Sequence, residues 1–178
     1  YVAKQNRVLV VAAHPDDEVL GCGGTIARHA DAGDLVNVLI VAEGATSRQV
    51  QRDRAQVDDE LSVLARAAQM AGSILGAEGV ELLDFPDNRL DSLDRLDLIK
   101  QVEERIARYQ PQLVYVHHAG DVNVDHRRLH EAVVTACRPT PGHCVKRLLS
   151  FEVPSSTEWQ PPGSAPSFSP NDGCHFSE

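Results

Sequence analysis

Aromatic and basic residues are both scarce in this chain of 178 residues. Phe, Tyr and Trp make up 4% of the sequence, and 17 Lys and Arg stand against 26 Asp and Glu, for a formal net charge of −9. A surplus of negative charge argues against a nucleic-acid backbone or an anionic membrane as the main partner. We therefore expect no nucleic-acid partner.

Long hydrophobic runs and paired cysteines are also missing. No apolar run approaches the roughly 20 residues that a membrane-spanning helix needs, and the apolar residues 8–13 lead directly into charged ones, unlike a signal peptide. This favours a cytoplasmic protein, although Tyr1 as first residue suggests that the true start precedes it. The four cysteines form no CxxC pair, so we expect reduced thiols rather than disulfides or a cysteine zinc site.

Hydrophobic periodicity predicts an α/β fold. Continuous apolar runs are typical of strands buried on both faces, and apolar residues at steps of three or four are typical of helices. The expected strands cover residues 8–13, 35–42, 80–85, 113–117 and 148–153, and the expected helices cover residues 25–32, 50–71, 92–109 and 126–137. Their alternation indicates a mostly parallel sheet with helices on both faces.

The length fits one domain with a core of its own. We expect residues 1–153 to form the body of this domain. Residues 154–178 hold five prolines among many serines and show no apolar periodicity. They are interpreted as a C-terminal segment of the same domain, partly ordered or truncated.

Potential metal ligands follow two of the predicted strands. His14, Asp16 and Asp17 come directly after the first strand, and residues 117–126, His-His-Ala-Gly-Asp-Val-Asn-Val-Asp-His, follow the strand at 113–117. In a parallel sheet, ligands bind outside the carboxyl ends of the strands. The fold is therefore expected to bring both clusters to one edge and to build a single site from them.

Imidazole and carboxylate ligands suit zinc, and a catalytic zinc keeps three protein ligands and an open water position. Water bound to such a zinc has a pKa of about 7. Of two adjacent aspartates, one can hold the metal while the other takes the proton of the water. The alternative for Asp-Asp-Glu is a solvated helix start, where acidic residues favour the helix dipole.

A glycine-rich loop is expected at Gly21, Gly23 and Gly24, ahead of the helix at 25–32. Such a loop close to the site can help to bind an anionic or polar group. The spacing G-x-G-x-x-G of a dinucleotide site fails, because Ile26 occupies the last required position.

Several motifs resemble one family. Residues 13–18, Ala-His-Pro-Asp-Asp-Glu, look like the signature of the PIG-L/LmbE-like zinc-dependent N-deacetylases. Further segments resemble the family in the same order along the chain: residues 19–27, 42–48, 86–89, 117–127 and 151–159. The resemblance implies a Rossmann-like three-layer fold. It also implies removal of an N-acetyl group from an N-acetylglucosamine-type sugar.

The resemblance also implies roles for individual residues. His14, Asp17 and His126 would ligate Zn²⁺, and other divalent metals stay open. Asp16 would be the general base and, once protonated, the acid for the leaving amine. Asp125 would orient a ligand histidine or a nearby proton carrier.

One position departs from the family pattern. Many members carry a histidine three residues before the last zinc ligand, where it stabilises the oxyanion, and this chain has Asn123 there. An asparagine amide can donate a hydrogen bond to an oxyanion but cannot transfer a proton. The proton transfer falls to His118 or to Asp16 alone.

Three charged residues are candidates for binding the substrate. Arg48 and Arg89 lie in loops expected to face the site, where an arginine can grip a sugar hydroxyl or a phosphate. Glu43 lies in the same region, and an exposed carboxylate is the alternative for it. The expected partner is a small acetylated amino sugar or glycoconjugate, and a homo-oligomer is compatible with the family, although no interface is identifiable.

Two other functions remain open at this stage. The metal site can serve hydrolysis of another amide, an ester or a phosphoester. Alternatively, the chain is a non-catalytic sugar- or nucleotide-binding module in which the carboxylates are structural.

Overall fold

The computed structural model describes residues 5–154 and 156–170. Tyr1, Cys174 and the end of the predicted C-terminal segment, residues 171–178, lie outside the described residues. Of the described cysteines, Cys137 and Cys144 are free thiols, and Cys22 is buried. No helix in these ranges is long and apolar enough to cross a membrane.

A sheet of five strands lies at the centre of the described chain. The strands are β1 (Arg7–Ala12), β2 (Leu35–Ala42), β3 (Gly79–Phe85), β4 (Leu113–His117) and β5 (Arg147–Phe151). Their order is β3-β2-β1-β4-β5, and every neighbouring pair is parallel. The predicted α/β fold with a parallel sheet is confirmed.

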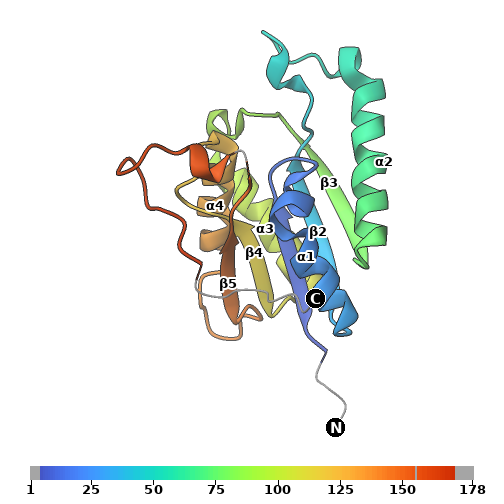
Figure 1. Ribbon diagram of the computed structural model, residues 1–178, viewed down its shortest axis with the longest axis vertical. Helices are drawn as coiled ribbons and strands as arrows, with labels where there is room; N and C mark the ends of the chain where they lie inside the picture. Colours follow the sequence, from blue (N-terminus) through green and yellow to red (C-terminus); the bar gives the residue numbers. More distant parts are fainter. Residues whose placement is uncertain (1–4, 155, 171–178) are drawn as a thin grey trace.

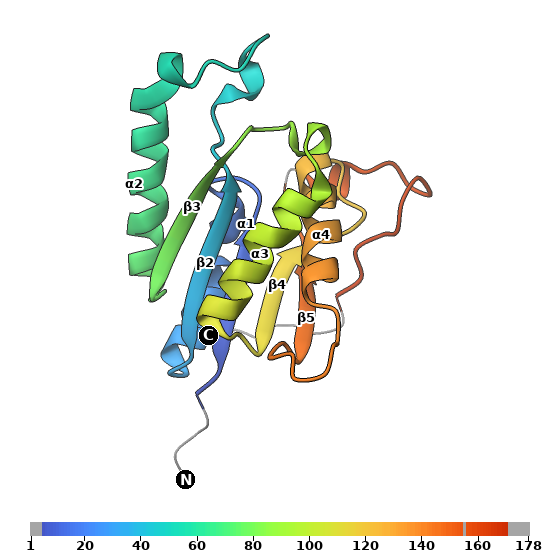
Figure 2. The same ribbon diagram turned by 180° about the vertical axis from the view of Figure 1, so that it is seen from behind.

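Helices cover both faces of this sheet and complete a three-layer, Rossmann-like sandwich (Figures 1 and 2). The helices are α1 (Asp17–Asp31), α2 (Asp58–Ile74), α3 (Arg95–Tyr109) and α4 (Val124–Ala136). Because side chains of a strand alternate between faces, Val8 and Val10 pack in the cluster under α1, and Leu9 and Val11 in the cluster under α3 and α4.

The first helix begins earlier than predicted, and the expected glycine-rich loop is part of it. The chain turns from β1 into α1 at Asp16, which has a φ of 147° and whose carbonyl accepts the N–H groups of Val19 and Leu20. Gly21 allows close packing of the helix against the end of β5. A Cβ on Gly21 would lie 2.3 Å from Cδ2 of Phe151 at the end of β5.

This packing predicts opposite effects for two glycines of the same helix. We expect Gly21→Ala to lower the free energy of unfolding by about 1–3 kcal/mol, because Phe151 must move. A Cβ on Gly23 would meet its nearest atoms at ordinary distances of 3.6 and 3.9 Å. Gly23→Ala should therefore stabilise the helix by up to about 1 kcal/mol. Urea unfolding of both variants tests this, and equal stabilities would contradict the packing argument.

The second predicted helix, residues 50–71, is also shifted. Its α-helical part is α2, and two 3₁₀ turns, Thr46–Arg48 and Arg54–Val57, lie ahead of it. Val50, the first residue of the predicted helix, is 95% exposed. The Asp53 side chain accepts the N–H of Ala55 and so starts a separate turn.

Candidate metal and active site

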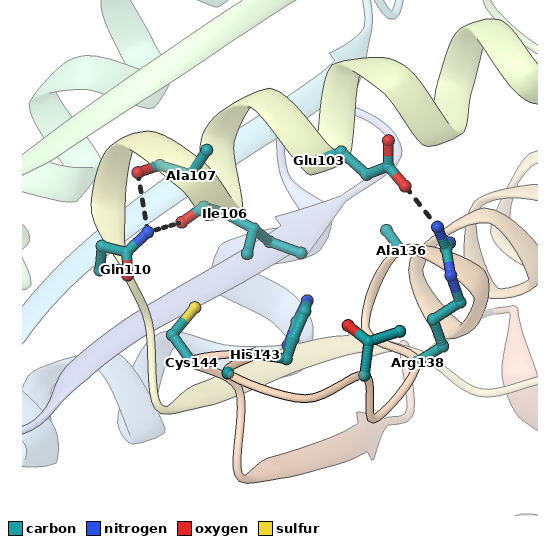
Figure 3. Close-up of a pocket in the computed structure, with 10 residues that line it drawn as sticks. Glu103, Ile106, Ala107, Gln110, Ala136, Arg138, His143 and Cys144 are labelled. Carbon is teal, nitrogen blue, oxygen red and sulfur yellow. Dashed lines mark hydrogen bonds and ion pairs between the residues drawn. The ribbon is translucent and has the colours of Figure 1, made fainter.

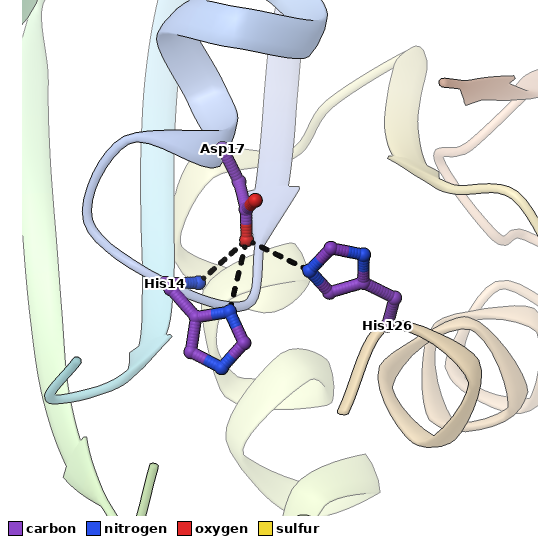
Figure 4. Close-up of side chains that lie close together, drawn as sticks. All are labelled: His14, Asp17 and His126. Atoms are coloured by element: carbon purple, nitrogen blue, oxygen red, sulfur yellow. Dashed lines mark hydrogen bonds and ion pairs between the residues drawn. The ribbon is translucent and has the colours of Figure 1, made fainter. Parts of the chain in front are cut away.

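The candidate site lies at the carboxyl ends of β1 and β4, which are neighbours in the sheet. The chain leaves β1 toward β2 on one side, while β4 and β5 extend the sheet on the other. This is the point of an open α/β sheet where ligands bind. His14 and Asp17 come from the turn between β1 and α1, and His126 comes from the first turn of α4 (Figure 4).

The carboxylate of Asp17 joins the two histidines. Its Oδ2 atom lies 3.2 Å from Nδ1 of His14 and 3.1 Å from Nε2 of His126. Asp17 is 4% exposed and His126 is 2% exposed. Burial alone would raise the pKa of Asp17, but the imidazoles of His126 and His14 beside its carboxylate hold it well below its usual range. Asp17 is therefore an anion that faces two imidazoles.

The outer nitrogens of both histidines face other carboxylates. Nε2 of His14 lies 3.0 Å from Oδ2 of Asp125, and Nδ1 of His126 lies 3.2 Å from Oδ2 of Asp121. An imidazole that donates its outer N–H to a carboxylate points the lone pair of its other nitrogen inward. Two inward lone pairs beside an anion can together bind a cation.

The donor set therefore fits a metal ion. Ligand atoms of His14, Asp17 and His126 all lie within 4.8 Å of one another. Nε2 of His126 is buried and has no hydrogen-bond partner within residues 5–154 and 156–170. Two imidazoles and one carboxylate form a donor set of catalytic zinc sites, in which water takes the fourth position. His14 also shows the attraction for a cation: burial alone would lower its pKa, but hydrogen bonds to Asp125 and Asp17 raise it to about 10.

Asp125 is fully buried at the start of α4. Besides facing His14, its carboxylate accepts the backbone N–H groups of Asn88, at 2.7 Å, and Leu90, at 2.9 Å. The loop after β3 thus holds the carboxylate against His14. This is the position needed for the predicted task of orienting a ligand histidine.

In the sequence, Asp16 lies between the candidate ligands His14 and Asp17, and it is exposed to solvent. Partial burial, together with the negative charge of Asp17, raises its pKa. Its positive φ is rare for a residue with a side chain and is held in place by Glu18, whose carboxylate accepts the N–H of Asp16 at 3.0 Å. Glu18 is 2% exposed, so this motif is a helix start with buried acids, unlike the solvated alternative.

Asn123 is the N-cap of α4. Its Oδ1 accepts the N–H groups of Asp125, at 2.8 Å, and His126, at 3.4 Å, and so orients the residues that follow. Its Nδ2 donates to Oδ1 of Asn88 at 3.0 Å. One amide hydrogen is left for another acceptor.

His118 does not join the cluster. Its Nε2 lies 2.8 Å from the carbonyl oxygen of Pro166, and its ring packs at 5.4 Å from that of Phe168. Consecutive residues at the end of a strand point to opposite faces. His117 therefore takes the place beside the ligands: its ring stacks on His126 at 3.8 Å, and its Nε2 accepts the N–H of Ala13 at 2.9 Å.

The candidate substrate residues are mostly engaged with the protein. Glu43 is buried, and its carboxylate accepts the N–H groups of Ala45 and Thr46, so it shapes the loop and is not an exposed carboxylate. Arg89 donates to the carbonyl of Gln49 at 2.7 Å and ties two loops together. The side chain of Arg48 is 88% exposed and lies 4.0 Å from Glu60.

Two buried carboxylates near the ligands were not singled out from the sequence. Asp87 is 3% exposed, and its Oδ1 lies 3.3 Å from Nε2 of His14. Asp121 is fully buried beside His126. Both lie in segments that resemble the family, and Asp87 follows the carboxyl end of β3. That placement is the signal that could have revealed it.

A separate cavity of about 280 Å³ lies between α3, the end of α4 and the loop before β5 (Figure 3). Glu103, Arg138, His143 and Cys144 line it, and Glu103 pairs with Arg138 at 3.2 Å. This loop precedes β5, so it lies at the amino ends of the strands. His143 in this loop is therefore remote from the metal ligands.

Residues 9–137 match the PIG-L family, described as GlcNAc-PI de-N-acetylase. The chain belongs to the PIG-L family. It is 30% identical to the uncharacterized deacetylase YaiS of Escherichia coli over 158 residues, which cover 86% of this chain and 77% of the relative. The predicted family is therefore confirmed.

Two other relatives widen the range of activities. The 1D-myo-inositol 2-acetamido-2-deoxy-alpha-D-glucopyranoside deacetylase of Kineococcus radiotolerans is 28% identical, with 73% of this chain and 44% of the relative covered. The crystal structure of GalB, the 4-carboxy-2-hydroxymuconate hydratase of Pseudomonas putida KT2440, has a TM-score of 0.62 and 29% identity. That match covers 78% of this chain and 59% of the hydratase, so the chain spans less than two thirds of both proteins.

Proposed function

We propose that this PIG-L family member is a zinc-dependent N-deacetylase. It would remove an N-acetyl group from an N-acetylglucosamine-type amino sugar or glycoconjugate. The observation that carries the proposal is the convergence of His14, Asp17 and His126, whose ligand atoms lie within 4.8 Å of one another. Asp16 precedes Asp17 in the chain, and the negative charge of Asp17 contributes to the raised pKa of Asp16. The deacetylases among its relatives support the same reaction class.

His14, Asp17 and His126 would hold the ion. Zinc in such a site lowers the pKa of a bound water to about 7 and polarises a carbonyl oxygen. Asp16 acts as the general base that takes a proton from the attacking water. The same carboxyl group then returns the proton to the nitrogen of the sugar as the C–N bond breaks, which yields acetate and a free amine.

Asn123 replaces the histidine that other members use. With its oxygen fixed by the backbone of α4, the direction of its NH₂ group is also fixed, and the hydrogen not given to Asn88 can reach an oxyanion. Because His118 lies elsewhere, Asp16 carries the proton in both directions. Glu43 and Arg89 are engaged within the protein. Of the three candidate substrate residues, the exposed Arg48 is therefore the one that can contact sugar hydroxyls.

Release of acetate tests the proposal. The full chain is loaded with zinc and offered N-acetylglucosamine, a nucleotide-linked N-acetylglucosamine and an N-acetylglucosaminyl glycolipid. We expect acetate from at least one of them, loss of activity after chelation, and recovery when zinc is returned. A chain without stoichiometric metal, or one that is active and insensitive to chelator, would overturn the zinc mechanism and favour a binding module or metal-free chemistry.

A second candidate function is the hydration of an unsaturated carboxylate. The 29% identity to the hydratase is close to the identities of the deacetylase relatives, and the same metal-bound water and Asp16 can serve addition to a C=C bond. Loss of the conjugated absorbance of 4-carboxy-2-hydroxymuconate tests it. Turnover of that compound, with no acetate from any N-acetylated sugar, would replace the first candidate.

A further inference from the structure

The contacts of Asp121 assign this carboxylate a task that the proposed reaction does not include. It is fully buried in the loop between β4 and α4. Its two oxygens accept from the hydroxyl groups of Ser156 and Thr157, and it also accepts the backbone N–H of Asn123 at 2.8 Å. Its remaining neighbour is Nδ1 of His126, at 3.2 Å from Oδ2.

The hydrogen bonds around Nδ1 of His126 determine whether this nitrogen carries a hydrogen. The single hydroxyl hydrogen of Ser156 is donated to Oδ1 of Asp121. Ser156 Oγ also lies 3.4 Å from Nδ1 of His126 and can therefore only accept there. Since both neighbours of Nδ1 are acceptors, Nδ1 carries a hydrogen. When the ring is neutral, Nε2 then has its lone pair free, directed at Asp17.

We propose that Asp121 is a positioning residue that sets the tautomer and orientation of His126 for metal binding, and that it is itself held by the segment around Ser156 and Thr157. Thr157 makes this link through one more bond, because its hydroxyl accepts the N–H of Val153 at 2.8 Å while donating to Asp121 at 2.6 Å. The segment after β5 and the metal site are thereby coupled. This inference rests on the metal site of the proposed function, and on no particular substrate.

The test is the affinity of the full chain for Zn²⁺, measured by competition with a chelator. Asp121→Asn should weaken binding by about 10–100-fold, because an amide NH₂ facing Nδ1 favours the wrong tautomer. Ser156→Ala, which keeps the carboxylate and removes one of its donors, should give a smaller loss. The NMR spectrum of the zinc-loaded wild type should show a His126 Nδ1 hydrogen that exchanges slowly with solvent.

Asp34→Asn is the matched control. Asp34 makes the same contact, its Oδ2 lying 2.6 Å from Nδ1 of His29, and it follows α1 at the end far from the metal ligands. We expect Asp34→Asn to change stability and leave zinc affinity as in the wild type. Equal zinc affinities of Asp121→Asn and wild type would overturn the inference, as would a His126 Nδ1 without a hydrogen. Zinc binding without acetate release would instead refute the proposed function and leave this inference standing.

Discussion

Replacing Asp16 with asparagine should lower kcat for acetate release by about 10²–10⁴-fold, the usual contribution of a general base. The amide has the shape of the carboxylate and tolerates the positive φ at this position. It cannot take a proton from water. The raised pKa of Asp16, caused by burial and by the charge of Asp17, strengthens it as a base when ionised.

Metal content and thermal stability separate this result from damage to the site. Asp16→Asn should bind zinc as the wild type does, and its Tm should be equal or slightly higher, since a negative charge beside Asp17 is removed. Asp31→Asn, at the exposed far end of the same helix, should keep full activity. An Asp16→Asn variant with near-normal turnover would show that another group serves as the base.

Of the elements of the fold, the strands were predicted most accurately from the sequence. The bounds of β2 and β4 agree with the predicted 35–42 and 113–117, because continuous apolar runs bounded by polar residues leave little freedom. The start of α1 could not be predicted in the same way. Its glycines disfavour a helix locally, and Gly21 is explained only by its contact with Phe151, 130 positions along the chain.

The position of the site could be predicted from the topology of the sheet, whereas the hydrogen bonds of its side chains could not. Placing His14 and His126 at one edge needs only parallel strands and their neighbours. Which of two adjacent histidines faces the ligands depends on where β4 ends, and that choice separated His117 from His118. The burial of Asp121 depends on residues after β5, a contact for which the sequence has no local signal.

Asn123 illustrates how one residue can satisfy two demands. As a helix N-cap it contributes about 1 kcal/mol to stability, and serine or aspartate would do this equally well. Only asparagine adds a neutral donor in a fixed direction. Asn123→Ser should therefore keep the fold and the metal while lowering kcat, with KM nearly unchanged. Wild-type kinetics of Asn123→Ser would reduce the role of Asn123 to capping.

Replacing Asp17 with asparagine should remove most of the stabilisation of the protein by zinc. In the wild type, zinc at about 1,000 times its Kd should raise the free energy of unfolding by about 4 kcal/mol and raise Tm accordingly. Asp17 supplies the anion that lies between both ligand histidines, so its loss removes a ligand and the negative charge that the two inner ring nitrogens share. We expect zinc affinity to fall by more than about 100-fold, beyond the range of residues that only orient ligands.

Asp125→Asn is the comparison that separates the loss of a metal ligand from the loss of a group that only orients a ligand. It keeps all three proposed ligands and weakens the contacts of this carboxylate with Nε2 of His14 and with the loop after β3, so its zinc affinity should fall by about 10–100-fold and its Tm should still rise with zinc. Titration of Tm against zinc for the wild type and both variants measures the order. If Asp17→Asn responded to zinc as strongly as Asp125→Asn, Asp17 would be an orienting group, and the metal would lie on the other side of His14, toward Asp87 and Asp125.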